Sequence, residues 1–77
     1  MKRTLGRLQP GDRGQVVAVG HSPEMDRLME LGFLEGESIE VLHQAPLGAD
    51  PIAVRVRGST IALRRAEADA VEVEVQS

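Results

Sequence analysis

One short amphipathic helix, with both of its ends marked, constrains the fold most; it lies in the run SPEMDRLMELGFLEG. The sequence predicts a helix over about Pro23–Leu31, because Ser22 can accept hydrogen bonds from the first turn and proline suits the first helical position. Gly32 supplies the left-handed residue that ends a helix, and Phe33 can fold back onto Leu28. The chain therefore contains one helix with a defined start and stop.

The other apolar segments have the composition and period of β-strands. β-Branched residues or strict alternation of apolar and polar residues mark five of them. The loop between the second and third, Pro46–Pro51, contains two prolines and a glycine. The sequence predicts a mainly β protein, a small five-stranded curled sheet or partly open barrel with one inserted short α-helix. The expected strands are Gln15–Val19, Ser38–Gln44, 52–57, 60–64 and Val71–Val75.

Two local details follow from the strand pattern. Ile39, Val41 and His43 have the same parity, so we expect His43 to be half-buried at a strand end. The pair Gly58-Ser59 is a two-residue hairpin signal between the third and fourth strands.

Length and charge limit the classes of protein. The chain has 77 residues, no cysteine and a net charge of −3, with 9 basic and 12 acidic residues. We expect a single domain over residues 1–77, without disulfides or thiolate metal sites. No apolar segment long enough to cross a membrane follows the basic start, and no overall field attracts nucleic acid. A soluble, cytoplasmic protein is expected.

The sequence offers little chemistry. No serine lies in a nucleophile turn and no thiol can pair with a histidine, so we expect no enzymatic activity, no catalytic residues and no bound cofactor. The candidates for a metal site are His21, Glu24 and His43, whose imidazoles and carboxylate suit ferrous iron. We expect no permanent site there; a carrier that binds Fe²⁺ transiently is the alternative.

A basic patch is a further candidate feature. Arg55, Arg57, Arg64 and Arg65 could bind nucleic acid, but the only aromatic residue is Phe33, whereas bases usually stack on aromatic side chains. We expect no nucleic-acid partner.

Protein contact is the remaining role for the surface. The candidate partner-binding residues are Met29, Leu34, Leu42 and Leu47, which fall in turns, on outward parity or on the helix. If the helix and the Pro46–Pro51 loop lie side by side, they form one apolar docking patch. A flat apolar surface on a small domain is also compatible with a weak homo-oligomer.

The order of the motifs resembles that of the FeoA family, the ferrous iron transport protein A type. The pattern L-x-x-L-x-P-G-x-x-G begins at Leu5, R-L-x-x-L-G-[FLM]-x-x-G covers Arg27–Gly36, and a Pro/Gly loop, a V-x-V strand and A-L-R follow. The resemblance implies an SH3-like small β-barrel with an inserted helix. It also implies a cytoplasmic accessory protein that touches the GTP-binding domain of the membrane ferrous-iron transporter FeoB.

Two positions depart from the family pattern. Glu35 stands where members often have proline, and Ala49 is inserted in a loop that usually reads P-x-G-D-P. A similar module forms the C-terminal domain of metal-dependent repressors of the diphtheria-toxin-repressor type. This chain has no helix-turn-helix portion, so a stand-alone relative of that domain is a second alternative.

Overall fold

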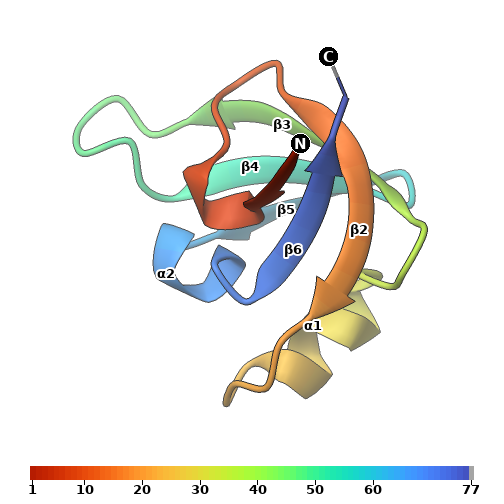
Figure 1. Ribbon diagram of the computed structural model, residues 1–77. Helices are drawn as coiled ribbons and strands as arrows, with labels where there is room; N and C mark the ends of the chain where they lie inside the picture. Colours follow the sequence, from red (N-terminus) through yellow and green to blue (C-terminus); the bar gives the residue numbers. More distant parts are fainter. Residues whose placement is uncertain (77) are drawn as a thin grey trace.

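The structure, a computed structural model, describes residues 1–76. Its elements follow one another along the chain as six strands, two short α-helices and one 3-10 turn (Figure 1). They are β1 (Lys2–Thr4), η1 (Leu5–Arg7), β2 (Arg13–Val19), α1 (Met25–Leu31), β3 (Ser38–Gln44), β4 (Ile52–Val56), β5 (Ser59–Leu63), α2 (Arg65–Ala68) and β6 (Val71–Val75). Neither α-helix of this part of the chain, of seven and four residues, has the length needed to cross a bilayer.

All six strands form one antiparallel sheet in the order β1-β6-β2-β3-β4-β5. The sheet curls on itself, with β2 bending around β6 and α1 standing at one end (Figure 1). The mainly β fold with one inserted helix is as predicted, and each of the five expected strands is present. β1 is an additional sixth strand. Its three residues show no alternation, and it exists because Lys2–Thr4 pairs with Glu72–Glu74 of β6.

The inner face of the curled sheet encloses one hydrophobic core. Successive side chains of a strand point to opposite faces of the sheet, and this decides which of them enter the core. In β6, Val71 and Val73 are buried whereas Glu72 and Glu74 are exposed. Phe33 is the largest fully buried side chain and lies in the same cluster as Leu28. The remaining core side chains come mainly from η1, β3, β4 and β5: Leu5, Leu8, Val16, Ile39, Val41, Ile52, Val54, Val56, Leu63 and Ala68.

The end of α1 is as predicted, but its start is not. Gly32 has a left-handed φ of 112°, and the N–H of Phe33 donates to the carbonyl of Leu28 at 3.1 Å. The helix begins at Met25, two residues later than expected. Ser22 does not cap it: its hydroxyl is buried and has no hydrogen-bond partner among residues 1–76, and its carbonyl accepts the Met25 N–H at 3.2 Å. A backbone turn, not a side-chain cap, leads into the helix.

Two expectations about the strands are corrected. His43 is exposed, because the pairing of β3 with β4 shifts between Val41 and His43 and the bulge turns its side chain outward. The β4–β5 hairpin turns one residue earlier than predicted, at Arg57-Gly58, since Val56 pairs with Ser59. Both turn residues have positive φ, 51° and 80°, as the type I′ turn requires.

η1 follows the edge strand β1, and α2 follows the other edge strand, β5. η1 and α2 pack together and so bridge the gap between the two edges of the sheet. Arg65 makes the connection: its Nη1 donates to the carbonyls of Gly6 and Leu8 at 2.8 and 2.9 Å. Its backbone N–H donates to Asp50 Oδ1 at 2.8 Å, which holds the loop before β4 against α2. The curled sheet thus forms a partly open barrel: β1 and β5 do not pair with each other, and η1 and α2 connect the two edges.

Candidate functional site

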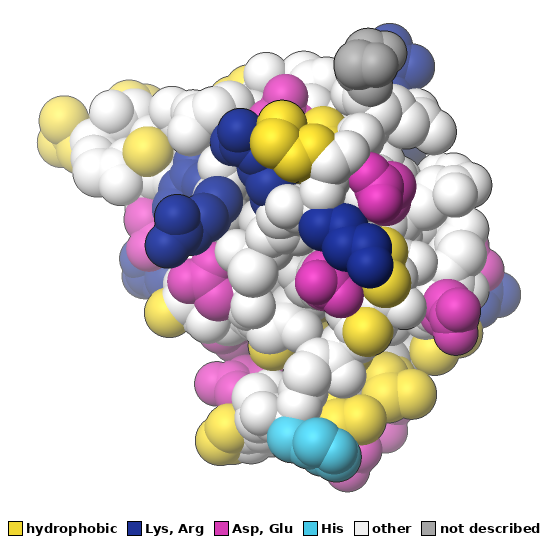
Figure 2. Space-filling view, in the orientation of Figure 1, with side chains coloured by type: hydrophobic (Ala, Val, Ile, Leu, Met, Phe, Trp, Pro, Cys, Tyr) yellow, Lys and Arg dark blue, Asp and Glu magenta, His cyan; other side chains and the backbone are white. Residues whose placement is uncertain are grey.

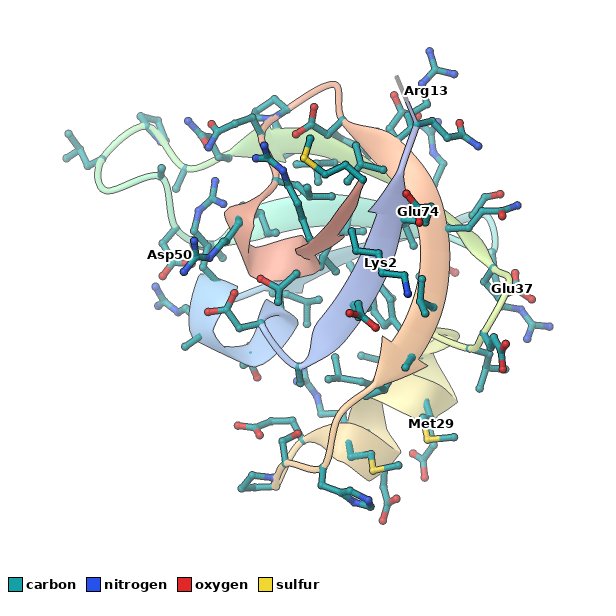
Figure 3. The ribbon with its side chains drawn as sticks, in the orientation of Figure 1. Lys2, Arg13, Met29, Glu37, Asp50 and Glu74 are labelled. Carbon is teal, nitrogen blue, oxygen red and sulfur yellow. The ribbon has the colours of Figure 1, made fainter. Side chains whose placement is uncertain are left out.

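An apolar hollow lies between β2 and α1. α1 follows β2 through a short turn and contacts it, which brings their partly exposed side chains together. Met29 projects from α1 at 39% exposure (Figure 3). Leu34 is half-buried and lines the same hollow. The hollow has a volume of about 200 Å³. We call it the helix hollow; it is lined by Val17, Ala18, Val19, Met25, Met29, Phe33, Leu34 and Glu35.

The loop between β3 and β4 is the second apolar feature. It projects from the body of the molecule on the side away from α1, and Leu47 within it is 90% exposed (Figures 1 and 2). β3 runs between the two, and seven residues of strand span about 20 Å. The expectation of one docking patch made by the helix and this loop is therefore wrong. Met29 and Leu34 lie at one end, Leu47 lies at the other, and Leu42 is half-buried within β3.

A second hollow, of about 260 Å³, lies at the base of that loop. Pro46 and Pro51 approach each other across the loop, because the Ala45 N–H donates to the carbonyl of Pro51 at 3.0 Å. Ala53 and Ala62, paired across β4 and β5, form its floor. We call this the loop hollow. This hollow was not predicted from the sequence, although the two prolines of the loop and the outward-facing alanine of β5 could have indicated it.

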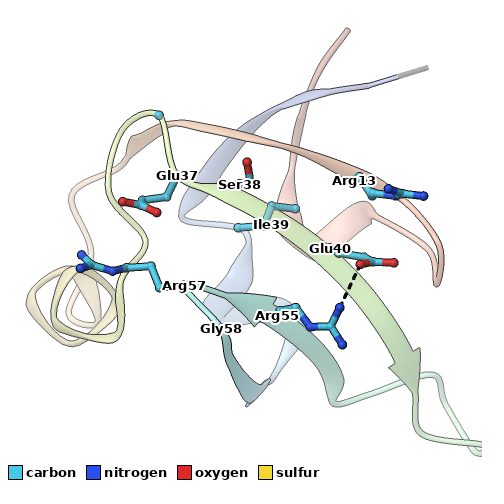
Figure 4. A pocket seen from close by; sticks show the side chains of 9 residues that line it. Arg13, Glu37, Ser38, Ile39, Glu40, Arg55, Arg57 and Gly58 are labelled. Carbon is cyan, nitrogen blue, oxygen red and sulfur yellow. Dashed lines mark ion pairs between the residues drawn. The ribbon is translucent and has the colours of Figure 1, made fainter.

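A charged hollow of about 430 Å³ lies on the outer face of β3 and the β4–β5 hairpin (Figure 4). Arg55 forms an ion pair with Glu40 across the two strands at 3.5 Å. Arg57 points toward Glu37 in Figure 4 but forms no ion pair within 4 Å among residues 1–76. Arg13 lies at the far rim. The four arginines considered as a basic patch do not act together, since Arg65 is engaged in the barrel seam.

Two of the metal candidates lie in the connection between β2 and α1, and the third lies on β3. His21 is exposed just after β2, Glu24 precedes the first turn of α1, and His43 lies near the end of β3 beside the loop hollow. Within the described residues, no three or more His, Asp or Glu side chains come together in a way that could hold a metal ion.

One carboxyl group has a perturbed acidity. The ammonium group of Met1 donates a hydrogen bond to Glu74, which lowers the pKa of that carboxyl below its usual value. The charge of Lys2, paired with Glu74 across β1 and β6, lowers this pKa further (Figure 3). Glu74 is exposed, and the contact joins the Met1 ammonium to the outer face of β6.

Comparisons with known proteins agree with this architecture. The family described as the FeoA domain matches residues 3–75. A fusion of Fe(2+) transport protein A with the Fe(2+) transporter FeoB, from Porphyromonas gingivalis, is 38% identical over 74 residues. The match covers 95% of this chain and 9% of the fusion protein, so the chain corresponds to a small part of that relative.

Solved structures extend the similarity to the fold. FeoA from Stenotrophomonas maltophilia, in complex with zinc and described as a prokaryotic SH3 domain protein, is 35% identical with a TM-score of 0.81. The alignment covers 92% of this chain and 88% of that one. A manganese-dependent transcriptional repressor has a TM-score of 0.85 at 22% identity, over 97% of this chain and 41% of the repressor. The repressor shares the fold, and the fold is SH3-like, as the motif order implied.

Proposed function

The chain belongs to the FeoA family, and we propose that it acts in ferrous-iron transport as a cytoplasmic accessory protein of a FeoB-type transporter. In this proposal it binds the transporter's GTPase domain and modulates it. The observation that carries the proposal is the fusion relative, in which the segment similar to this chain shares one polypeptide with FeoB. Covalent linkage raises the effective concentration of two modules, which favours pairs that contact each other.

The helix hollow is the surface that we assign to this contact. It is concave and mostly apolar, and Met29 at its border is a flexible, polarizable side chain that adapts to a partner surface. Burial of an exposed apolar side chain stabilises a complex by about 25 cal/mol per Å² removed from water. Met29 and Leu34 are thus the partner-binding residues of the proposal. Leu47, at the opposite end of the molecule, serves as its control.

The test compares two aspartate variants for binding to the purified GTPase domain of the FeoB-type transporter from the same organism. Met29→Asp places a charge in the helix hollow and is expected to weaken binding at least tenfold. Leu47→Asp introduces the same charge at a more exposed position and is expected to leave the affinity unchanged. Both positions are on the surface, so circular dichroism should show an intact fold. Equal affinities for both variants and the unmodified chain would remove the helix hollow from the proposal.

A further inference from the structure

The two edges of the sheet are protected to different degrees. β1, at one edge, has three residues, two of which are Lys2 and Arg3. Short edge strands and charged side chains are the usual protection against pairing with another chain. β5, at the other edge, has the sequence STIAL, with no charge, no proline and no break in its register with β4. In the described part of the chain, β4 is the only element with an extended contact to β5.

Register fixes which backbone groups of β5 point away from β4. Val56 and Ser59 flank the two-residue turn and form a hydrogen-bonded pair, and such pairs alternate along an antiparallel ladder. Ser59, Ile61 and Leu63 therefore bond to β4, whereas the N–H and C=O groups of Thr60 and Ala62 point outward. No backbone hydrogen bond of residues 1–76 outside the ladder engages either residue. Two donors and two acceptors are presented in the spacing of an additional strand.

Side chains beside this edge are basic at both ends and apolar in the middle. On the outer face, Thr60 pairs with Arg55, and Ala62 pairs with Ala53 on the floor of the loop hollow. Arg64 follows the strand with the same parity as Ala62. It is exposed and, among the described residues, forms no ion pair within 4 Å. A neighbouring strand would lie against Thr60, Ala62 and Arg64, with Arg55, the ion-pair partner of Glu40, one strand beyond Thr60.

Arg57 adds a second basic group at the turn. Its φ of 51° is unfavourable for a side chain with a Cβ, and Asn-Gly is the preferred pair for this turn. Non-glycine residues in such conformations cluster at functional sites. Its side chain lies over Gly32 and lines the charged hollow, so this arginine marks the turn before β5 and does not itself border the outward groups of the strand.

We propose that β5 is a docking strand for an extended peptide segment of a partner protein, which adds a seventh strand to the sheet. The segment carries one apolar side chain, opposite Ala62 and next to the loop hollow. It carries acidic side chains two residues before and after, opposite Thr60 and Arg64. Main-chain hydrogen bonds to Thr60 and Ala62 supply affinity, and the flanking charges supply specificity.

A second copy of the chain fits the edge poorly. Antiparallel pairing of two β5 strands about Ile61 would place Thr60 of each copy opposite Ala62 of the other. The strand STIAL carries no acidic side chain, so a second copy offers no opposite charge to Arg64. An acidic segment from another protein has the complementary charge.

The experiment uses the ¹⁵N-labelled full chain and the capped peptide Thr-Glu-Thr-Val-Thr-Glu-Thr as the probe. In the free protein, the amides of Thr60 and Ala62 should exchange with solvent faster than those of Ser59, Ile61 and Leu63. Added peptide, up to about 2 mM, should shift both amide signals saturably and slow their exchange at least fivefold. The same peptide with lysine in place of glutamate should bind at least tenfold more weakly.

Two variants separate the backbone contact from the side chain. Thr60→Pro removes the outward N–H but no ladder hydrogen bond, and it should reduce peptide affinity at least tenfold; Thr60→Val keeps the N–H and should bind normally. Slow exchange at Thr60 and Ala62 in the free protein would overturn the proposal. Equal binding of the glutamate and lysine peptides would also overturn it, and so would amide signals of Thr60 and Ala62 that do not shift when peptide is added. These two results do not depend on whether the proline variant folds. Protection that rises with protein concentration alone would identify a second copy as the occupant.

Discussion

Arg65 joins segments that are far apart in the chain. Besides the carbonyls of η1, its guanidinium donates from Nε to the Ala49 carbonyl at 2.8 Å and from Nη2 to Gln44 Oε1 at 2.7 Å. Ala49 has a left-handed φ of 57°, and its carbonyl is one of the acceptors in the barrel seam. The planar fork of an arginine suits several acceptors at once, which a lysine ammonium matches poorly.

Replacement of Arg65 by alanine should lower the free energy of unfolding by about 2–4 kcal/mol, because part-buried carbonyls lose charged donors. Arg64→Ala is the matched control: it removes an exposed neighbouring arginine whose side chain forms no such bonds, and it should change stability by less than about 0.5 kcal/mol. Urea denaturation measures both. Coincident unfolding curves for the two variants would contradict the role given to Arg65.

Glu74 provides a prediction about pH. Its pKa in the folded protein lies below the ordinary value of 4.5, chiefly because the Met1 ammonium donates to it. A lowered folded-state pKa means that the contact stabilises the protein above the unfolded-state pKa, and that this contribution is lost as the pH falls through the folded value. An NMR titration of the Glu74 carboxyl should show the low pKa. Acetylation of Met1 should raise it; an unchanged midpoint after acetylation would refute the assignment.

At the scale of elements, the end of α1 is coupled to the β4–β5 hairpin. The Arg57 side chain lies over Gly32, and a Cβ at position 32 would come within 2.8 Å of its Cδ. Gly36 also has positive φ, 88°, but nothing lies within 4 Å of a Cβ placed there. Both glycines therefore have a backbone conformation that disfavours a side chain, but only at Gly32 would an added Cβ also collide with a neighbouring residue.

Alanine at each glycine should separate these effects. Gly36→Ala should cost about 1–2 kcal/mol from backbone strain alone, and Gly32→Ala about 2–4 kcal/mol, because overpacking adds to strain. Thermal unfolding followed by circular dichroism gives both values. In an Arg57→Ala background the difference should shrink. A difference that persists there would show that the hairpin does not press on Gly32.

Elements whose limits depend on local chemistry were predicted best. The stop of α1 needs a left-handed residue, which Gly32 adopts cheaply, and the bounds of β3 and β6 follow their own alternation. The start of α1 depends on where the Ser22 hydroxyl points, which tertiary packing decides. β1 exists only through its pairing with β6, so no pattern within its three residues could indicate it.

At the scale of the whole molecule, the sequence predicted exposed apolar residues but not their arrangement. Met29 and Leu47 are both exposed, as expected, yet β3 separates them. The sequence also grouped Arg65 with three surface arginines, whereas the fold turns it into the barrel seam. Distances between surface features depend on the path of the chain through the sheet, and neither composition nor local spacing encodes that path.

We propose that this SH3-like barrel acts by binding a FeoB-type transporter. The most direct test of this proposal is calorimetric titration of the unmodified chain into the purified GTPase domain of the FeoB-type transporter from the same organism. We expect saturable binding with one chain per domain and a Kd of about 1–100 μM. Absence of binding at domain concentrations up to about 1 mM, with both proteins folded, would contradict it.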